Sequence, residues 1–494
     1  MDFSKERSVT FLRAAAQALH DENVRLREEN ARLRTQLGES SSLAEENAAL
    51  KDLLARREHA LFGRSSERRG RSGSASKPER TPQTGHGPRE QPEIEHVTIR
   101  HELLPEERVC PCCGGQLVPL GNAVESSELI SVTERAFAKE THEQVVYRCA
   151  CNSAVVTAPG PLRLQARGRY SVKFAIEVAI AKYADHLPLE RQVQIMKREG
   201  LRIDSQTLWD QLDVLAKHLL PTYEAIIAEI LATPVIHADE TRWPLLDNGK
   251  TKENKVFQAW GLVAPELVAY RILDSRGKAA AATVLGEYEG VVMADAYTVY
   301  TSLAAETGKF EVAHCWAHVR RKFVECEKNF PEEAGVALAL IRDLYAVERE
   351  AEGDSRAALR AERSRPIVDK LMDWARETRP TVLPRSGIGE AIGYMLNIEE
   401  GLRRYLSDPR IPIDNNRCER ALRGVVLGRK NHYGSRSRRG TEVAAILYTL
   451  MESAKLAGVS PRAYLQAATE LAIRSPGQVL MPKQFKAQQA AETG

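Results

Sequence analysis

Two short apolar segments that each run into an aspartate constrain this chain most. The first, residues 234–243, begins with a proline and the β-branched pair Val235 and Ile236, and reaches Asp239 three residues later. β-Branched residues after a proline predict the start of a buried strand. The second segment, residues 290–297, is apolar up to Asp295. A carboxylate at the end of a buried strand is costly unless a cation compensates it, so each segment predicts a strand with a compensated acid at its end.

The pair of aspartates favours a shared divalent cation, because Mg2+ prefers oxygen ligands. Taken one at a time, Asp239 and Asp295 could each cap the following element instead, since aspartate is a common N-cap residue. As a pair, and together with a third acid later in the chain, they favour a metal site.

The residues around these aspartates predict the order of a sheet. After the Asp239 strand come strands at 255–263 and 267–273, a helix at 278–285, the Asp295 strand and a strand at 311–316. The short connection at 264–266 favours a hairpin between the second and third strands. Three antiparallel strands, a helix and then further strands are the order of a ribonuclease H-like sheet, in which the first and fourth strands are adjacent. We therefore expect Asp239 beside Asp295.

The third acid lies in a basic segment near the end of the chain. Between residues 414 and 439 there are eight Arg or Lys against two acids. If a helix begins near Asp414, then Glu419, Arg420 and Arg423 share one face. Such a surface suits phosphate binding next to a metal. Ion pairing along the helix is the alternative for Glu419, but it does not explain the basic tract at 428–440. The intervening residues 324–406 read as an inserted helical subdomain.

The N-terminal residues 1–62 predict a coiled coil. Leucine recurs every seven residues, at Leu12, Leu19, Leu26 and Leu33. Asn23 and Asn30 lie in the companion core position, where asparagine commonly sets register and strand number. We expect self-association through this seam, although a single amphipathic helix packed on its own protein is the alternative. Residues 63–96 are rich in Gly, Ser, Pro and Arg, and predict a basic flexible linker.

Five of the eight cysteines lie between residues 110 and 151, which favours a metal module over scattered thiols. Cys110 and Cys113 have the C-x2-C spacing of a zinc ribbon, and Cys149 and Cys151 would complete the site. Cys112 could replace a neighbour. Buried cysteines without a metal are the alternative.

Residues 161–232 predict helices at 170–183 and 189–198, a glycine turn and a helix from about Asp204 to Leu215. This is the outline of a helix-turn-helix, and an ordinary helical hairpin has the same outline.

Bulk composition limits the function less than these segments do. The 494 residues suffice for several domains, and a net charge of +3 supports nucleic-acid binding only where basic residues cluster. No apolar run approaches the length of a membrane span, and the N-terminus lacks a signal-peptide core. We expect a cytoplasmic protein that does not associate with membranes.

Five motifs, taken together, resemble a known family. They are His-Ala-Asp-Glu-Thr at 237–241, Ala-Asp-Ala-Tyr at 294–297, His-Cys-Trp-Ala-His-Val-Arg-Arg-Lys-Phe at 314–323, Asp-Asn-Asn-Arg-Cys-Glu-Arg at 414–420 and Gly-Arg-Lys-Asn at 428–431. In this order they resemble the transposases of the insertion sequence IS-66 family. Two segments depart from the family pattern: the second cysteine pair is C-x-C, and the tract after Asn431 is shorter and less aromatic.

The resemblance implies a DDE transposase with a ribonuclease H-like core interrupted by helices. Its triad would be Asp239, Asp295 and Glu419, holding two Mg2+ or Mn2+ ions, with Zn2+ in the cysteine module. Cys315 and His318 match a Cys-x2-His signature and are expected to be structural. The candidate phosphate contacts are Arg420, Arg423, Arg429 and Lys430.

The expected partners are the inverted-repeat ends of an element, its target DNA, further copies of the chain and accessory proteins encoded by the same element.

The expected organisation is a multidomain α/β chain. Its parts are the coiled coil at 1–62, the linker at 63–96, a zinc-finger-like module at 97–160, a helix-turn-helix-like domain at 161–232, the first part of the core at 233–323, the helical insertion at 324–406, the last part of the core with Glu419 at 407–460 and a tail at 461–494. A nuclease or resolvase that cuts without joining, a DNA-binding regulator without catalysis and an assembly scaffold are the alternative functions.

Overall fold

The computed structural model describes residues 137–493 with gaps at 149–154, 247–255, 352 and 354, together with Gln17, 20–22, 24–27 and Leu50. The few described residues before residue 51 are helical. The rest of the predicted coiled coil and the whole linker lie outside the described residues. So do Cys110, Cys113, Cys149 and Cys151, the cysteines of the predicted zinc module.

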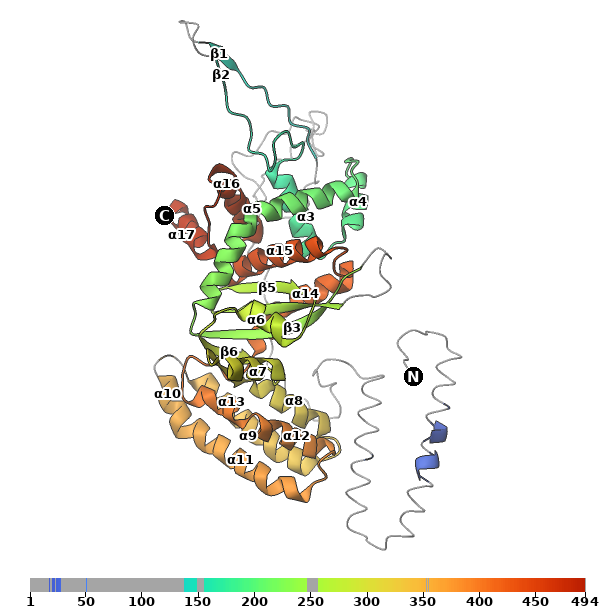
Figure 1. Ribbon diagram of the computed structural model, residues 1–494, viewed down its shortest axis with the longest axis vertical. Coiled ribbons are helices and arrows are strands. Elements are labelled where there is room, and N and C mark those ends of the chain that lie inside the picture. The colour runs from blue at the N-terminus through green and yellow to red at the C-terminus, as the bar shows by residue number, and fades with distance from the viewer. Residues whose placement is uncertain are drawn as a thin grey trace, which may run out of the picture. The chain divides into compact units, whose positions relative to one another are not determined.

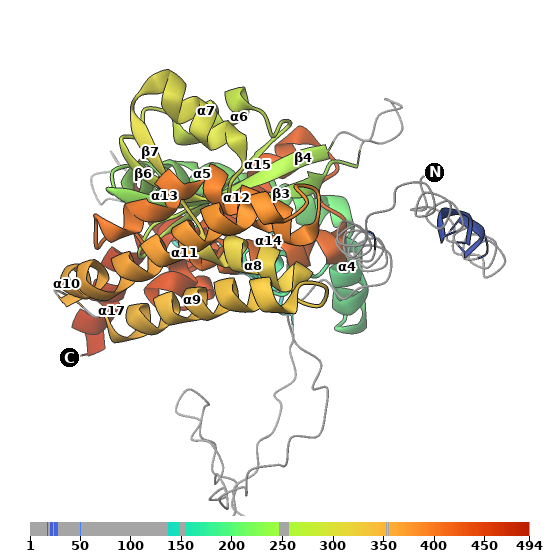
Figure 2. The same cartoon turned by 90° about the horizontal axis from the view of Figure 1, so that it is seen from below.

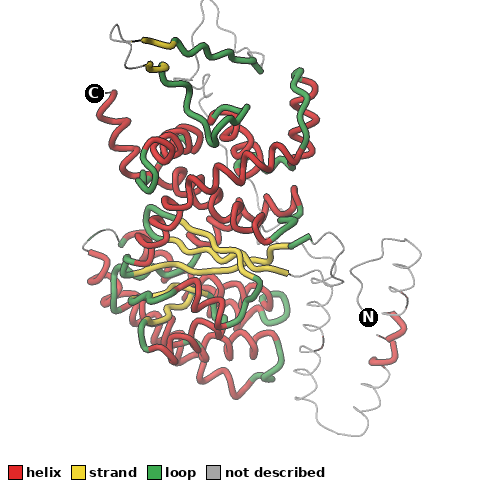
Figure 3. The backbone as a smooth tube through the Cα atoms, turned by 45° about the horizontal axis from the view of Figure 1, so that its top comes forward, coloured by secondary structure: helices red, strands yellow, loops and turns green. Residues whose placement is uncertain are grey.

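A five-stranded mixed sheet forms the centre of the region that follows residue 234 (Figure 3). Its strands are β3 (Val235–Pro244), β4 (Val256–Val263), β5 (Val268–Leu273), β6 (Gly290–Ala294) and β7 (Phe310–His314), in the order β5-β4-β3-β6-β7. β3, β4 and β5 are antiparallel neighbours, whereas β6 is parallel to both β3 and β7. The mixed α/β class predicted from the sequence is confirmed.

The central strand is longer than the sequence predicts. A strand that ends at Asp239 was expected, but β3 continues to Pro244 because residues 237–244 all pair with β4. On its other side β3 pairs with β6 only over residues 235–237. The predicted end of the strand near Asp239 is therefore wrong for the pairing with β4, and it holds only for the pairing with β6. Asp239 lies beyond the last residue of β3 that pairs with β6, but it still pairs with β4.

Different helices cover the two faces of the sheet (Figure 2). On one face lie α6 (Lys278–Leu285) and α7 (Thr298–Thr307), whose Tyr300 ring packs 6.1 Å from the ring of Trp260 on β4. On the other face lies α14 (Asn416–His432), whose Leu422 packs against Gly261 of β4. Beside α14 is α8 (Trp316–Cys326), which directly follows β7.

The outer edge of β5 is closed by α15 (Arg438–Ala457) rather than by another strand. The backbone N–H groups of Val268 and Tyr270 point outward and donate to the hydroxyls of Ser453 and Thr449 at 3.1 and 2.9 Å. The Ser453 hydroxyl in turn donates to the carbonyl of Val268 at 2.7 Å. An exposed strand edge invites pairing with other chains, and these side chains satisfy its polar groups from within the same protein.

Helices fill the chain between α8 and α14, and in Figure 1 they lie together beyond β6. They are α9 (Pro331–Glu350), α10 (Ser355–Leu359), the π-helical turn η2 (Arg360–Ser364), α11 (Arg365–Thr378), the short η3 (Arg379–Thr381), α12 (Gly387–Asn397), α13 (Glu399–Arg403) and the short η4 (Arg404–Leu406). Arg360, with 1% of its surface exposed, ties them together. Its guanidinium bonds both carboxylate oxygens of Glu348 at 2.7 Å and the carbonyls of Tyr405, Asp408 and Ile411 at 2.6, 3.1 and 3.0 Å.

The residues before β3 form a small hairpin of β1 (Val146–Arg148) and β2 (Val155–Thr157), followed by α3 (Val172–Tyr183), α4 (Leu189–Arg198) and α5 (Ser205–Leu231). Asp204 caps α5 by accepting the N–H of Thr207 at 2.7 Å. α5 continues past Leu215 and ends at Leu231. The expected tail folds into α16 (Pro461–Arg474) and α17 (Pro482–Thr493), and α16 buries Tyr464 and Leu465. In the described part of the chain no helix is both long and apolar enough to span a membrane.

His432, at the end of α14, is a buried and uncharged histidine. Its Nδ1 lies 3.2 Å from the carbonyl of Gly434 and its Nε2 lies 3.3 Å from the hydroxyl of Tyr448. Burial, followed by the positive charges of Lys182 and His186, lowers the pKa of His432 to about 3. A histidine free in the unfolded chain has a pKa of about 6.5. The unfolded state therefore binds more protons between these two pH values, and stability falls as the pH drops through that window.

Between pH 7 and pH 5, the shifted pKa of His432 should lower the free energy of unfolding of the unaltered protein by about 2 kcal/mol. We expect His432→Gln to abolish this part of the pH dependence. The measurement is urea unfolding at both pH values, followed by the fluorescence of Trp243, whose ring lies 5.8 Å from that of His432. His142→Gln, at an exposed histidine, is the control and should leave the pH dependence as it is in the unaltered protein. If His432→Gln keeps the pH dependence of stability of the unaltered protein, the lowered pKa of His432 is wrong.

Candidate active site

The register of β3 and β6 brings Asp239 and Asp295 together. The last parallel pair is His237 opposite Met293, and each aspartate follows its strand's member of that pair by two residues. Adjacent strands are about 4.8 Å apart, and residues two apart on a strand share a face. Both side chains therefore belong to one face, where the strands begin to part. Each Oδ1 accepts a local backbone bond, from Glu240 N–H at 2.8 Å and from Tyr297 N–H at 2.9 Å.

α14 covers that same face. Asp239 pairs with Gly261 of β4, and residues directly opposite each other on antiparallel strands share a face. A Cβ placed on Gly261 would come within 3.2 Å of Leu422 and 3.5 Å of the Cys418 sulfur. The missing side chain thus lets α14 approach the sheet beside Asp239. Glu419, the next residue after Cys418, lies in the first turn of this helix.

The pKa of Asp239 depends on its burial and on the neighbouring acids. Burial, followed by the charges of Glu240, Asp295 and Glu419, raises the pKa of Asp239 to about 7, against the lowering effect of the backbone N–H of Glu240. Asp295 and Glu419 therefore lie close enough to Asp239 for their charges to raise its pKa. A cation between them would offset these charges and favour the charged form of Asp239.

Glu419 leans toward α8. Its Oε1 lies 3.6 Å from His318 Nε2 and its Oε2 lies 3.6 Å from an amino nitrogen of Arg321. These distances are longer than hydrogen bonds, and within the described part of the chain the buried atoms Glu419 Oε1 and His318 Nδ1 have no hydrogen-bond partner. Burial lowers the pKa of His318, which disfavours the charged ring, while Glu419 acts in the opposite direction.

Cys315 contacts the same turn from the other end. Its sulfur accepts the backbone N–H of Asn415 at 3.1 Å, and burial raises the pKa of the thiol to about 12. The two residues of the Cys-x2-His pair therefore face residues 415 and 419, which are one helical turn apart.

The carboxylates of Asp239, Asp295 and Glu419 are the candidate ligands for a divalent ion. Among the described residues, no three His, Cys, Asp or Glu side chains are close enough to hold a metal as they stand. The chemistry nevertheless fits a hard cation, because three carboxylates supply oxygen ligands and Glu419 Oε1 lacks a partner. The residues that would hold the ion are Asp239, Asp295 and Glu419.

A family model described as Transposase IS66 family matches residues 167–443, which include β3 to β7, α14 and all three acids. The chain belongs to the IS66 transposase family. Three curated relatives from Sinorhizobium fredii (strain NBRC 101917 / NGR234) are described as uncharacterized proteins. The chain is 33% identical to y4jD over 80% of its own length and 81% of the relative's. It is 32% identical to y4qI over 84% and 79%, and 30% identical to y4hP over 72% and 69%.

A second acid of the family motif, Glu240, is compensated on the opposite face. Strand alternation turns it away from Asp239, and its buried carboxylate bonds Arg276 at 2.6 Å and the Tyr300 hydroxyl at 2.8 Å. The Arg276 guanidinium also lies 4.0 Å above the ring of Tyr297. The alternation of β3 could have revealed the direction of Glu240. No sequence signal indicates Arg276, because the contact joins positions 36 residues apart without a motif.

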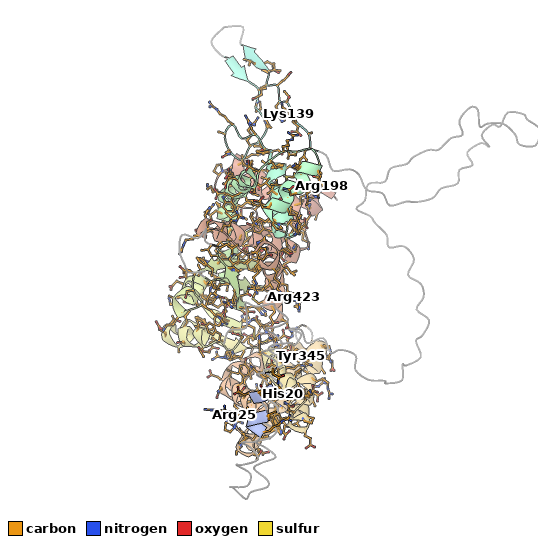
Figure 4. All side chains as sticks on the ribbon, turned by 90° about the vertical axis from the view of Figure 1, so that its right-hand side faces the viewer. His20, Arg25, Lys139, Arg198, Tyr345 and Arg423 are labelled. Atoms are coloured by element: carbon orange, nitrogen blue, oxygen red, sulfur yellow. The ribbon has the colours of Figure 1, made fainter. Side chains whose placement is uncertain are left out.

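The four candidate phosphate contacts of this IS66 member divide into two groups. Arg420, Arg423 and Lys430 are exposed along the outer side of α14 (Figure 4 labels Arg423). Arg429 is partly buried and donates to the Thr241 hydroxyl at 2.9 Å and to the carbonyl of Arg242. Its guanidinium is therefore bound to β3.

We expect Arg276→Met to destabilise the folded protein by about 2–4 kcal/mol, because it leaves the fully buried Glu240 carboxylate without its cation. Arg462→Met is the matched control. Arg462 is similarly exposed, but its partner Glu177 keeps 22% of its side chain in solvent, so the loss should stay below about 1 kcal/mol. Urea unfolding of both variants measures the difference, and equal losses would contradict a structural role for the Arg276 pair.

Proposed function

We propose that this IS66 family member is a DDE transposase that cleaves and joins the DNA ends of an insertion sequence by phosphoryl transfer. Asp239, Asp295 and Glu419 would hold two Mg2+ or Mn2+ ions. The observation that carries the proposal is the shared face: the β3–β6 register and the packing of α14 on Gly261 bring all three acids to one end of the sheet.

The sheet supports the proposal. The order β5-β4-β3-β6-β7, with three antiparallel strands followed by two parallel ones, is that expected of a ribonuclease H-like core. The helices between α8 and α14 correspond to an insertion in that core. This part of the fold would act as a rigid frame that carries two acids on strands and one on a helix.

A small rearrangement of Glu419 completes the proposed site. Its contacts with His318 and Arg321 are 3.6 Å long, so no short hydrogen bond holds the carboxylate against α8. Rotation about side-chain bonds moves such a group between staggered conformers without a change in the helix. We propose that Glu419 turns toward Asp239 and Asp295 when a cation binds.

The chemistry that two bound ions supply is activation of water or a 3′-hydroxyl and stabilisation of the leaving oxygen. The side chains of the protein hold and orient the reacting groups, and none needs to act as the nucleophile. Partial burial of Asp239 disfavours its charged form, and a bound cation would compensate that charge. Arg420, Arg423 and Lys430 would bind DNA phosphates on the exposed side of the helix that carries Glu419.

We further propose the domain division expected from the sequence for the parts before the core. The coil at 1–62 would join copies of the chain, and the zinc module would use Cys110, Cys113, Cys149 and Cys151. The leucine and cysteine spacings support these two proposals. DNA ends and target DNA are the proposed partners, with accessory proteins of the same element.

We expect Asp239→Asn to lower cleavage of DNA that carries the element's inverted repeat by about a thousandfold, or about 4 kcal/mol of barrier. The amide removes a charged metal ligand, and it suits a buried position that disfavours charge. Binding to the same DNA, measured by gel shift in EDTA, should persist. Asp274→Asn, at an exposed aspartate paired with Arg438, is the control.

Unchanged cleavage by Asp239→Asn would remove this residue from the triad. Cleavage by the unaltered protein without joined product would identify a nuclease, and DNA binding without either reaction would identify a regulator.

Replacing both Arg420 and Arg423 by alanine should weaken DNA binding and make it less dependent on salt. Each lost phosphate contact reduces the slope of log Kd against log salt concentration by about 1, so the double variant should lose about 2. The measurement is Kd between 50 and 200 mM salt. Arg474→Ala, at an exposed arginine on α16 paired with Glu470, is the control, and an unchanged slope in the double variant would exclude this face.

A further inference from the structure

One asparagine joins the strand of Asp239 to the helix of Glu419. Asn415 directly precedes α14, lies four residues before Glu419 and has none of its surface exposed. A fully buried amide must find hydrogen-bond partners, because an unpaired one costs about 1–3 kcal/mol. The partners of Asn415 come from three different elements.

The side chain of Asn415 bonds β3 at two consecutive residues. Its Nδ2 donates to the carbonyl of Ala238 at 2.9 Å, and its Oδ1 lies 2.9 Å from Nδ1 of His237. The amide oxygen can only accept, so His237 must carry its proton on Nδ1. Burial lowers the pKa of His237 to about 4, which keeps the ring neutral. These two bonds hold the segment of β3 immediately before Asp239.

The backbone of Asn415 bonds the other two elements. Its N–H donates to the sulfur of Cys315, at the start of α8, over 3.1 Å. Its carbonyl accepts the N–H groups of Cys418 and Glu419 at 3.0 and 3.2 Å. The same residue is thus bonded to the strand that carries Asp239 and to the backbone of Glu419 itself.

This use of the side chain is unusual for the position. Asn415 is the N-cap residue of α14, and an asparagine there usually accepts an N–H from the first turn of its own helix. Its side chain makes no such bond. Asp414 accepts the N–H of Asn416 at 3.1 Å instead, and the hydroxyl of Tyr345 on α9, labelled in Figure 4, holds Asp414 at 3.0 Å. The cap function has moved to Asp414, which leaves the amide of Asn415 for β3.

Few other side chains could make both bonds. An aspartate lacks the donor and would set a negative charge against the carbonyl of Ala238. A serine is shorter and has a single hydroxyl for two partners 2.9 Å from the amide. A glutamine places the same groups one methylene farther out, which an interior packed at crystal density does not accommodate without strain.

We propose that Asn415 is a positioning residue that sets the separation of the backbone segments that carry Asp239 and Glu419, so that the two carboxylates can meet at a divalent cation once Glu419 turns toward it. The inference rests on the proposed function, because it assigns these acids to one metal site. Asn415 does not itself contact the ion. It acts through β3 and the first turn of α14, and residues that orient metal ligands typically change metal affinity or activity 10- to 100-fold when altered.

The test compares Asn415→Ser with two controls. Asn416→Ala changes the neighbouring asparagine, whose side chain bonds only Asp414, at 2.6 Å. Ser386→Ala removes a buried helix cap of α12 that is unconnected with the three acids. It therefore reports a loss of stability alone.

Two quantities are measured on the full chain: the rise in Tm on addition of Mn2+ without DNA, and the Mn2+ concentration that gives half-maximal cleavage. A ligand at concentration L that binds only the folded state stabilises it by RT ln(1 + L/Kd), so a weaker site needs a proportionally higher ligand concentration for the same rise in Tm. We expect Asn415→Ser to need about tenfold more Mn2+ in both measurements. Asn416→Ala and Ser386→Ala should keep the Mn2+ dependence of the unaltered protein.

If Asn415→Ser keeps the unaltered Mn2+ dependence, or shares its change with Ser386→Ala, the positioning role is wrong and the proposed function stands. If the unaltered protein shows neither a Tm rise nor cleavage with Mn2+, both the inference and the proposed function fail. Should Asn415→Ser not fold, His237→Asn tests the same bond from the β3 side and carries the same expectation.

Discussion

The central strand β3 pairs with its two neighbours over different lengths, and the rest of the structure depends on this constraint. β3 pairs with β6 over residues 235–237 and with β4 over residues 237–244. Where β6 separates from β3, Asp239 keeps a strand partner on β4 alone. The parallel register carries Asp295 to the same point on the neighbouring strand. Gly261 on β4 then allows α14 to approach the sheet beside Asp239.

The two consecutive acids of β3 show two ways in which a protein accommodates a buried carboxylate. Glu240 is neutralised by the Arg276 guanidinium and a tyrosine hydroxyl, both supplied by the chain. Asp239 accepts one backbone hydrogen bond, and no described cation forms an ion pair with it, so burial and neighbouring acids raise its pKa. The charged form of Asp239 therefore lacks the compensation that Arg276 gives to Glu240. The strand alternation keeps these two environments on opposite faces.

The helices between α8 and α14 leave this geometry intact because the two ends of this stretch of chain are held together. The backbone N–H of Trp316, at the start of α8, donates to the carbonyl of Ile413 at 3.1 Å, and Cys315 accepts the N–H of Asn415. Closing a loop costs free energy that rises only slowly with its length, so a long insertion is tolerated where its ends are bonded. Arg360 adds a second tie by bonding three carbonyls of the returning segment. The turn at residues 413–419 is thereby fixed against the sheet.

Much of the core could be predicted from the sequence, because strand patterns and the acids at 239, 295 and 419 are local signals. β-Branched runs predicted the strands, and the ordered motifs identified the family. The bond of Arg429 to β3 and the two bonds of Asn415 to β3 join residues 177 to 188 positions apart in the chain. The length of β3 depends on its pairing with β4. Such pairings leave no periodic pattern in the sequence. Sequence alone indicated where the strands and the candidate acids lie along the chain, since these follow from residue type and spacing. Only the tertiary structure decided which face each acid occupies and which polar groups hold it, because those depend on where distant segments pack.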